Sequence, residues 1–285
     1  MNDFGVITAA SEKFSSALMA MVRSIRRNWS HDIPITVFDL GLDASSIQKL
    51  ETIHAVSVRR VPEFCPHWRK HYTWKLWAII NCEYREFLWI DAGVFVMRPL
   101  SGVVRAIKEA GLFLVPNYQD LANEAPVASV YSAGLTFAQI QNRSSVSANI
   151  MGINRSHEKF SVFEEAYRLA LDEVNISATT QSHRHDQALI SCVLYSKYPD
   201  IVFFDGRMYA GWSGPSQVVG QSCWGHRRRL LERDRVQLEL LGDSARARYF
   251  PRDPARETPL ILRMLHALKI RLGRYVKNEK IIGIR

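Results

Sequence analysis

The segment EFLWIDAG, residues 86–93, carries the strongest structural signal in this chain. Its first five residues have the length and apolar character of a strand in the interior of a sheet. The run ends at Asp91, and Gly93 allows a tight turn or the close approach of a ligand. The segment therefore predicts a buried strand with a carboxylate at its carboxyl end. Asp91 has two interpretations here, because such an aspartate can hold a cation or a ribose hydroxyl, or can simply end the strand in a turn.

Strands and helices alternate along the first hundred residues. The sequence predicts strands at residues 4–8, 34–38, 56–61 and 86–90, and helices at residues 14–29, 47–53 and 72–82. This alternation is typical of a mostly parallel sheet covered by helices on both faces. Ligands bind such sheets at the carboxyl ends of the strands, which makes the loop after Thr8 and the turn at Asp91 candidate sites. We therefore expect an α/β fold with a mixed, mostly parallel, Rossmann-like sheet.

The second half of the chain is less regular. Apolar runs predict strands at residues 111–116, 149–153 and 201–205, and helices at residues 163–174 and 186–195. Asp186 lies in the first turn of the last of these helices, where a carboxylate suits the helix dipole. No internal repeat or low-complexity segment interrupts the chain.

The charge of the chain is unevenly distributed. The 285 residues are 47% hydrophobic and 23% charged, the balance of a soluble globular protein, which excludes a disordered chain or a disulfide mini-scaffold. The formal net charge of +9 lies in residues 226–285, where 16 Lys and Arg stand against 7 Asp and Glu. Nucleic acid or an anionic membrane is therefore a candidate partner of the last sixty residues only.

The expected location is the cytoplasm. The first residues lack a basic segment followed by an apolar one, and no run of about 18 apolar residues predicts a membrane span. The four cysteines are scattered without a CxxC pair, which favours reduced thiols over a metal cluster or a redox motif.

Three polar groups have both structural and functional interpretations. Lys75 is a lone cation on an apolar helix, where lysine usually reaches solvent. The segment HRHDQ, residues 183–187, can cap the following helix or grip adjacent sugar hydroxyls. The segment HRRR, residues 226–229, can offer an imidazole to a metal and guanidiniums to a diphosphate, or simply begin a basic helix. The motifs of P-loop kinases, dinucleotide dehydrogenases, zinc proteases and α/β-hydrolases are absent from the sequence.

Four segments together resemble the GT-A-fold glycosyltransferases, the group that includes bacterial lipopolysaccharide galactosyltransferases and glycogenin-like enzymes. They are VITAAS (residues 6–11), YTWK (72–75) with FLWIDAGVFV (87–96), VSANIMGI (146–153) and RHDQAL (184–189). The second and fourth are the more specific. The resemblance implies a GT-A domain over residues 1–230, and a basic C-terminal region follows at residues 231–285.

The resemblance also implies a nucleotide-diphosphate sugar as donor, with a UDP-sugar as the first choice. In such enzymes the loop after the first strand holds the base, an Asp-x-Asp motif binds ribose and a divalent metal, and a basic residue on the preceding helix contacts the donor. An Asp-Gln pair binds the transferred sugar. Carried over to this chain, the candidate catalytic residues are Asp91, Asp186 and Gln187, and the candidate donor-binding residues are Thr8, Ala10, Lys75, Asp91, Ser147, Asn149, Arg227 and Arg228.

The chain departs from the family pattern at the expected metal site. Gly93 stands where the second carboxylate of Asp-x-Asp is expected, so Asp91 and His226 are the candidate ligands that remain for Mn²⁺ or Mg²⁺. The alternative is a metal-independent site in which Lys75 or the arginines of residues 227–229 neutralise the leaving diphosphate. Both solutions stabilise the same negative charge that develops on the leaving diphosphate, and the sequence does not decide between them. It also does not decide whether the configuration at the anomeric carbon is retained or inverted.

The C-terminal region predicts a basic amphipathic helix over about residues 258–277. Thr258 and Pro259 are typical of a helix start, and the helix would have an apolar side and a one-signed basic side. Such a helix can lie in an anionic membrane interface or dock its apolar side on the domain. The membrane interpretation fits a glycan or lipid-linked acceptor at the cytoplasmic face of the membrane.

Two alternatives to a glycosyltransferase of surface polysaccharide or lipopolysaccharide synthesis remain at this stage. Gly93 is compatible with a relative that binds sugar nucleotides without turnover. A nucleic-acid-binding protein would explain the basic region, but the neutral body and the absence of interleaved aromatic residues in that region argue against nucleic acid as a partner.

Overall fold

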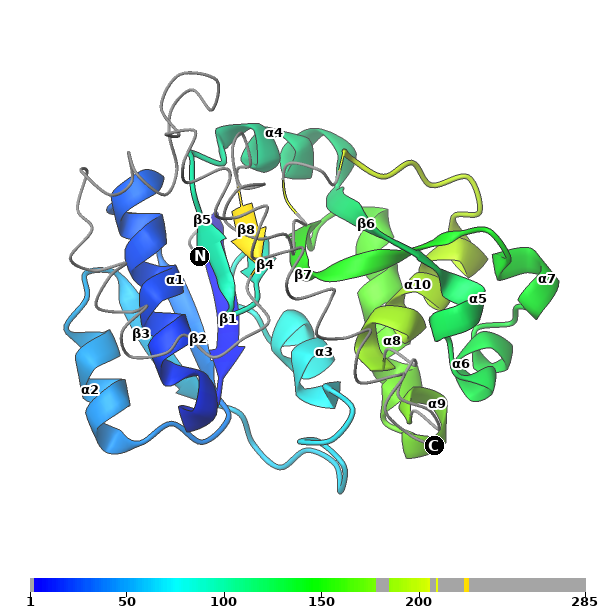
Figure 1. Ribbon diagram of the computed structural model, residues 1–285, viewed down its shortest axis with the longest axis horizontal. Coiled ribbons are helices and arrows are strands. Elements are labelled where there is room, and N and C mark those ends of the chain that lie inside the picture. Colours follow the sequence, from blue (N-terminus) through cyan, green and yellow to red (C-terminus); the bar gives the residue numbers. More distant parts are fainter. Residues whose placement is uncertain (1–2, 178–184, 206–208, 210–222, 226–285) are drawn as a thin grey trace, which may run out of the picture. The chain divides into compact units, whose positions relative to one another are not determined.

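The computed structural model describes residues 3–177, 185–205, 209 and 223–225. Its centre is a six-stranded sheet in the order β3-β2-β1-β4-β7-β6 (Figure 1). The strands of this sheet are β1 (Phe4–Ala10), β2 (Ile35–Asp39), β3 (Val56–Arg60), β4 (Glu86–Ile90), β6 (Leu112–Asp120) and β7 (Ser144–Asn154).

The sheet is mixed and mostly parallel, as the sequence predicts. β1 runs parallel to both of its neighbours, with Ile7 beside Thr36 on β2 and beside Trp89 on β4. β2 and β3 are parallel as well, whereas β7 is antiparallel to both β4 and β6. A separate two-stranded sheet pairs β5 (Val94–Val96) with β8 (Cys223–Gly225).

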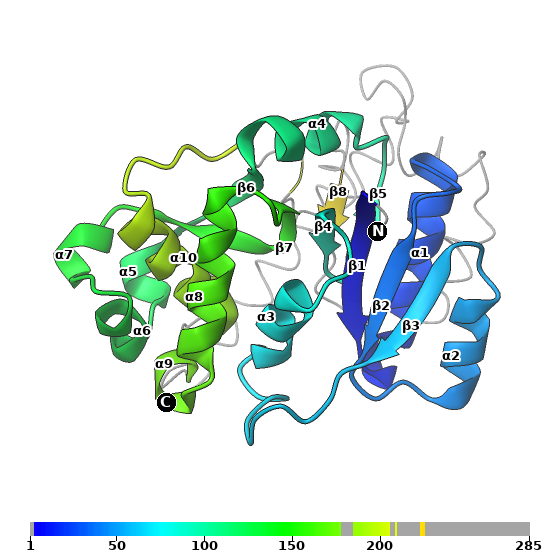
Figure 2. The same cartoon turned by 180° about the vertical axis from the view of Figure 1, so that it is seen from behind.

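Helices pack on both faces of the six-stranded sheet (Figures 1 and 2). Side chains on β4 alternate between the faces, so that Leu88 and Ile90 join one apolar cluster and Phe87 and Trp89 join another. The first cluster includes residues of α1 (Ser15–Asn28), α2 (Ala44–Glu51) and α4 (Ser101–Ala110). The second includes residues of α3 (Thr73–Ile80), α8 (Ser161–Ala170) and α10 (His185–Lys197). Burial on both faces explains why β4 is apolar at every position after Glu86.

Four short helices between β6 and α10 were not predicted from the sequence. They are α5 (Leu121–Glu124), α6 (Val127–Ser132), α7 (Phe137–Ile140) and α9 (Glu173–Ile176). α5, α6 and α7 contribute Leu121, Val130 and Ile140 to a third apolar cluster, which packs on Ala188 and Cys192 of α10. Single turns of this length bury one or two apolar residues each, too few to produce a helical period in the sequence.

Several predicted elements have different boundaries in the structure, and the largest differences are in α8 and β7. The predicted helix at residues 163–174 ends at Ala170, because the side chain of Asp172 accepts the N–H of Val174 and begins the separate helix α9. The predicted strand at residues 149–153 is the second half of β7, which begins earlier, at Ser144. Serines fill the first half of β7, so the hydrophobic pattern missed it.

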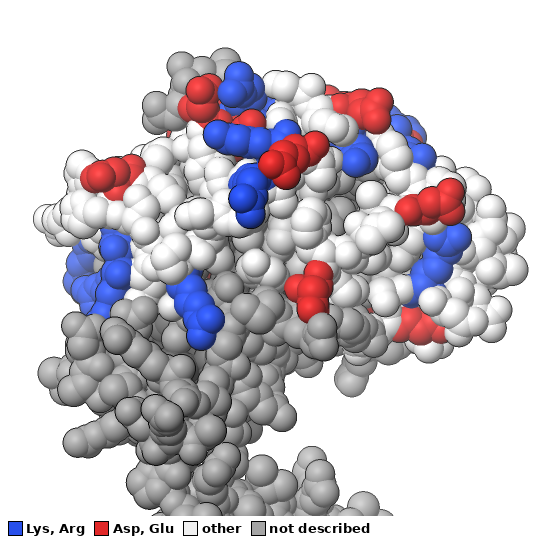
Figure 3. Space-filling view, turned by 90° about the horizontal axis from the view of Figure 1, so that it is seen from above, with Lys and Arg blue, Asp and Glu red and all other residues white. Residues whose placement is uncertain are grey.

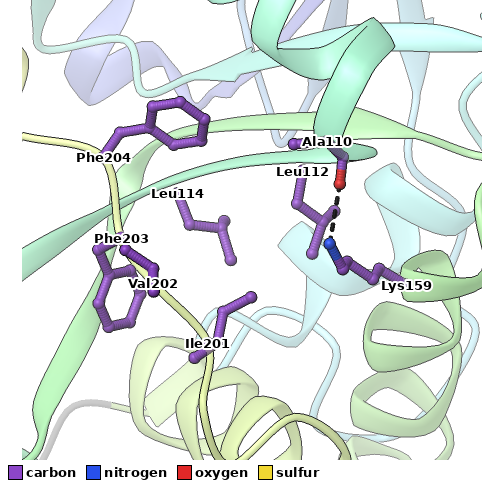
Figure 4. Close-up of a pocket in the computed structure, with 8 residues that line it drawn as sticks. All are labelled: Ala110, Leu112, Leu114, Lys159, Ile201, Val202, Phe203 and Phe204. Atoms are coloured by element: carbon purple, nitrogen blue, oxygen red, sulfur yellow. Dashed lines mark hydrogen bonds between the residues drawn. The ribbon is translucent and has the colours of Figure 1, made fainter.

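The predicted strand at residues 201–205 is wrong. This segment is irregular, and its backbone contact with β6 is one hydrogen bond from the N–H of Phe204 to the carbonyl of Leu114. Figure 4 shows the segment beside β6, where the two border a pocket of about 240 Å³ together with Lys159. The apolar run therefore reflects side-chain packing, since the Phe204 ring lies 4.9 Å from that of Phe113.

The surface of the described part is mixed in charge on the face shown in Figure 3, where basic and acidic side chains lie close together. None of the described helices combines the length and the apolar character needed to cross a membrane.

Candidate active site

Three of the predicted site residues meet in direct contact. The ammonium of Lys75, on α3, lies 3.0 Å from Oδ1 of Asp91 and 3.2 Å from Oδ2 of Asp186. Asp91 follows the last residue of β4 and Asp186 lies in the first turn of α10. The site is therefore at the carboxyl edge of the parallel strands, the edge at which α/β sheets bind ligands.

Lys75 is buried among oxygen atoms of the protein. Its side chain is 5% exposed, and its third partner is the carbonyl of Ala148 on β7, at 3.0 Å. The contact with Ala148 is a hydrogen bond, whereas those with Asp91 and Asp186 are ion pairs, and Oδ2 of Asp186 has no hydrogen-bond partner among the described residues. Burial by itself lowers the pKa of Lys75, but the charges of Asp186 and Asp91 outweigh burial and raise the pKa above its ordinary value. Lys75 is therefore a fixed cation between two carboxylates.

Asp91 is the most accessible of the three, with a side chain 35% exposed against 9% for Asp186. Its Oδ1 also accepts the indole N–H of Trp89 at 2.8 Å. Its backbone N–H donates to the carbonyl of Asn149, and its carbonyl accepts the N–H of Val94 in a turn. Asp91 thus forms the turn that one interpretation predicts, and its partly exposed carboxylate lies at the sheet edge.

Two predicted donor-binding residues have polar atoms without partners among the described residues. Thr8 is fully buried on β1, and its Oγ1 makes no hydrogen bond. Asn149 is buried on β7; its Oδ1 accepts the Ser147 hydroxyl at 2.5 Å, but its Nδ2 has no acceptor. Buried polar atoms without partners cost free energy, and ligand sites are one reason for a fold to keep them.

The hydrogen bonds described for Ala10 and Gln187 are made with residues outside the cluster of Lys75, Asp91 and Asp186. The carbonyl of Ala10 accepts the N–H of Leu40. The Gln187 amide donates to Oε2 of Glu124 at 3.2 Å and to the Ser145 hydroxyl at 3.1 Å. No contact joins Gln187 to Lys75 or Asp91 in the described part of the chain. Residues 186 and 187 are adjacent on a helix, so their side chains point in directions about 100° apart.

The sequence reasoning missed the buried carboxylate of Glu124. It lies on α5 and accepts the Ser145 hydroxyl at 2.6 Å in addition to the Gln187 amide. Ser145, Ser147 and Asn149 alternate along β7 and therefore share one face of the strand. The Ser-x-Ser-x-Asn pattern directly before and at the start of the expected strand is the signal that was available for this polar face.

A second group that the sequence reasoning missed lies directly before α3. His71 and Tyr72 both have left-handed backbone conformations, with φ of 55° and 60°. Imidazole nitrogens of His71 lie 3.1 Å from Oε1 of Glu173 and 3.2 Å from Nδ1 of His185. The Tyr72 ring is exposed and its centroid lies 5.9 Å from the Lys75 ammonium. Two consecutive left-handed residues other than glycine store strain, which is common at functional sites.

The same sheet edge also contains a cavity of about 650 Å³ at the carboxyl ends of β2 and β3. Asp39, Arg60, Trp68 and Arg69 are among the residues that line it. This edge of the sheet therefore has a cavity, the charged cluster around Lys75 and the charged contact of His71 with Glu173. The aromatic side chains of Trp68 and Tyr72 lie there as well.

The described residues do not by themselves form a divalent-metal site at Asp91. The Lys75 ammonium lies between Asp91 and Asp186, and no third carboxylate, imidazole or thiol joins them within the described part of the chain. A hard divalent cation needs more oxygen ligands than one partly exposed carboxylate supplies. The predicted second ligand, His226, lies outside the described residues.

Other predictions fall on residues that the structure does not describe. They are the diphosphate contacts of Arg227, Arg228 and Arg229, the first residues of the HRHDQ segment, and the C-terminal helix at about residues 258–277.

Comparisons with known proteins agree with the fold. No protein-family model matches the sequence, and no curated protein matches it either. Among solved structures, the WbbM bifunctional glycosyltransferase in its apo form superposes with a TM-score of 0.53 at 10% identity, over 80% of this chain. The match spans 46% of that enzyme. The galactosyltransferase LgtC, solved with donor and acceptor sugar analogues, superposes with a TM-score of 0.52 at 14% identity, over 84% of this chain and 95% of LgtC. The predicted GT-A fold is thereby confirmed.

Proposed function

We propose that this chain is a glycosyltransferase that moves a sugar from a nucleotide-diphosphate sugar, preferably a UDP-sugar, to a glycan or lipid-linked acceptor. The observation that carries the proposal is the cluster of Lys75, Asp91 and Asp186 at the carboxyl edge of a GT-A sheet. A buried ion-pair cluster built from distant segments, at the sheet edge where α/β folds bind ligands, is a candidate functional site. LgtC, which has the same fold, was solved with donor and acceptor analogues.

The chemistry of glycosyl transfer matches the charges of the cluster. Breaking the bond between the sugar and the diphosphate leaves positive charge at the anomeric carbon and negative charge on the leaving group. Asp91 and Asp186 offer carboxylate oxygens that can orient sugar hydroxyls and stabilise the cationic carbon. Lys75 holds both carboxylates in place and keeps the net charge of the cluster at minus one, which limits the repulsion of an approaching diphosphate.

Neutralisation of the leaving diphosphate needs further positive charge. Because the Lys75 ammonium is already paired with two carboxylates, we assign this role to Arg227 and Arg228, with His226 and Asp91 as the metal-dependent alternative. Guanidiniums bind diphosphate oxygens in pairs, and a metal would supply the same charge. The two solutions respond differently to chelation, which makes them separable.

The acceptor side of the proposal rests on the basic C-terminal region. Its net positive charge and the amphipathic helix expected within it fit an enzyme that works at an anionic membrane surface on surface polysaccharide or lipopolysaccharide.

A ligand-binding panel tests the donor. The purified chain is unfolded thermally with UDP-, GDP-, CMP- and dTDP-sugars, each with Mn²⁺ and with EDTA. We expect a UDP-sugar to raise the melting temperature through binding to the native state. A rise that persists in EDTA supports the arginine solution, and a rise that requires Mn²⁺ supports the metal. If no nucleotide sugar stabilises the chain, the proposed donor class is wrong.

Conservative variants test the cluster. Asp91→Asn and Asp186→Asn preserve shape and remove charge, so we expect each to reduce transfer by at least about a hundredfold, the scale of losing one electrostatic group in a site. Asp200→Asn is the matched control, because Asp200 is an exposed carboxylate outside the cluster. Circular dichroism checks that each variant is folded. Full activity in both cluster variants would disprove the site. If the unaltered chain binds a sugar nucleotide but transfers no sugar, it is the non-catalytic sugar-nucleotide-binding protein with which Gly93 is compatible.

A further inference from the structure

Three metal-ligating side chains lie together far from the proposed active site. His31 and Asp32 precede β2, and His54 precedes β3. β1 to β4 are parallel neighbours, so residues before these strands lie at the amino edge of the sheet, opposite to the edge that carries Asp91. No step of the proposed reaction uses them.

The separations of the candidate ligand atoms are close to those of a metal site. Oδ1 of Asp32 lies 3.4 Å from Nδ1 of His31 and 3.3 Å from Nε2 of His54, and the three ligand atoms lie within 4.8 Å of one another. Two ligands at the tetrahedral angle with zinc bonds of about 2.0–2.1 Å are roughly 3.3–3.4 Å apart. The two imidazole nitrogens lie no more than 4.8 Å apart.

The backbone around the cluster is fixed by a residue that takes no part in it. The guanidinium of Arg26 donates to the carbonyl of Ile33 at 2.8 Å and to that of His54 at 2.7 Å, and so ties together the two segments that carry the ligands. The rings of His31 and His54 are stacked, with centroids 5.1 Å apart. This arrangement lowers the ordering cost of binding. The charge of Arg26 also acts on Asp32 and opposes a cation there, so the neutral imidazoles must supply much of the affinity.

We propose that His31, Asp32 and His54 form a binding site for Zn²⁺ or a similar divalent transition metal, with a coordination position left for water or a further ligand. Two imidazoles and one carboxylate suit zinc, whereas Mg²⁺ and Ca²⁺ prefer oxygen ligands alone. The side chains are 71%, 84% and 61% exposed, which leaves room for that fourth position. Without a metal, the Asp32 carboxylate is hydrogen-bonded to the His31 imidazole and lies within ion-pair distance of the His54 imidazole. This site does not depend on the proposed function.

Thermal unfolding of the full chain, without an affinity tag, tests the site after EDTA treatment and removal of the chelator. We expect ZnCl₂ at about a hundred times its dissociation constant to raise the melting temperature by several degrees, and MgCl₂ to leave it unchanged. Co²⁺ serves as a spectroscopic probe, because cobalt with few ligands absorbs visible light much more strongly than the hexaaqua ion. Absence of a zinc-induced rise in the unaltered chain would overturn the proposed site, and the three side chains would then interact only with one another.

Variants locate the metal. His31→Ala and His54→Ala should each abolish the zinc-induced rise and the cobalt absorption. His157→Ala is the control for loss of an imidazole, since His157 lies outside the cluster and caps a short turn through Lys159. Asp91→Asn is the control for metal bound at the opposite edge of the sheet. Both controls should keep the rise. A rise that survives in His31→Ala and His54→Ala, or disappears in Asp91→Asn, would overturn the assignment.

Discussion

Lys75 combines burial with full ionisation, and this determines what its removal does. Without Lys75, no cation lies between the carboxylates of Asp91 and Asp186. Because the Asp186 side chain is only 9% exposed, its charge is then buried without a partner. Trp89 is the other residue that fixes Asp91, through its indole N–H. At the residue scale, the site is therefore a small rigid network around one ammonium.

Replacement of this lysine has a predictable pH dependence. We expect Lys75→Met to lower the free energy of unfolding by about 3–5 kcal/mol at pH 7. The folded-state pKa of Lys75 is raised above the ordinary 10.5, so its stabilising effect is complete below that pH and is lost only as pH rises through the higher, folded-state value. Urea unfolding of both proteins from pH 6 to 10 should therefore give a constant difference. If the difference in free energy of unfolding between the two proteins decreases between pH 8 and 10, burial outweighs the two carboxylates and lowers the pKa of Lys75.

At the scale of elements, the beginning of α3 is the unusual feature. Helices usually start at a residue in an extended conformation with a capping side chain, whereas α3 follows Tyr72 in the left-handed region and has no side-chain cap. The contact between His71 and Glu173 joins this start to α9, and the contact between His71 and His185 joins it to α10. The left-handed backbone at His71 and Tyr72 is therefore stabilised by contacts with α9 and α10, which come much later in the sequence.

A pair of substitutions measures that strain. His71→Ala and His71→Gly both remove the imidazole, but only glycine adopts a φ of 55° without cost. We expect His71→Gly to be more stable than His71→Ala by about 1 kcal/mol in denaturant unfolding. The same pair at Glu164, an exposed position inside α8, should give the opposite order, with glycine about 1 kcal/mol less stable than alanine. Equal stability of the two His71 variants would mean that the left-handed backbone stores no strain.

Several elements were predictable because their signals are local. The strand at residues 86–90 has the predicted bounds, since burial on both faces leaves an unbroken apolar run. The contact of Asp91 with Asp186 through Lys75 was not predictable from spacing, because three distant segments create it. The direction of Gln187 depends on Glu124, in a helix too short to be recognised. The prediction of a strand at residues 201–205 was wrong, because a short apolar run is expected both for a buried strand and for an irregular segment with packed aromatic side chains.

At the scale of the whole molecule, the charge divides the chain into a neutral part and a basic one. The mixed charges in Figure 3 indicate that the described surface lacks a one-signed field on that face. Any attraction to an anionic surface must then come mainly from residues 226–285, whose net charge equals that of the entire chain.

A charge-reversal experiment tests this division in the full-length protein. Arg271→Glu combined with Arg274→Glu should strongly reduce flotation with vesicles that contain anionic lipid, since each basic residue near such a surface contributes about 1 kcal/mol. Arg105→Glu combined with Lys108→Glu, on the exposed side of α4, makes the same change in charge within the described part and should leave flotation almost unchanged. Equal losses in the two double variants would mean that net charge alone, and not the C-terminal region, attracts the protein.

The position of Trp89 has an optical consequence. Its indole is fully buried, donates to Asp91, and has the Lys75 ammonium 5.2 Å from its ring centroid. The excited state of indole responds to nearby charge and to the loss of its hydrogen bond, so a ligand that draws Asp91 away changes the emission of this residue. The chain thus contains its own fluorophore beside the charges proposed to meet the donor sugar, and occupancy of the site can be followed in real time without a label.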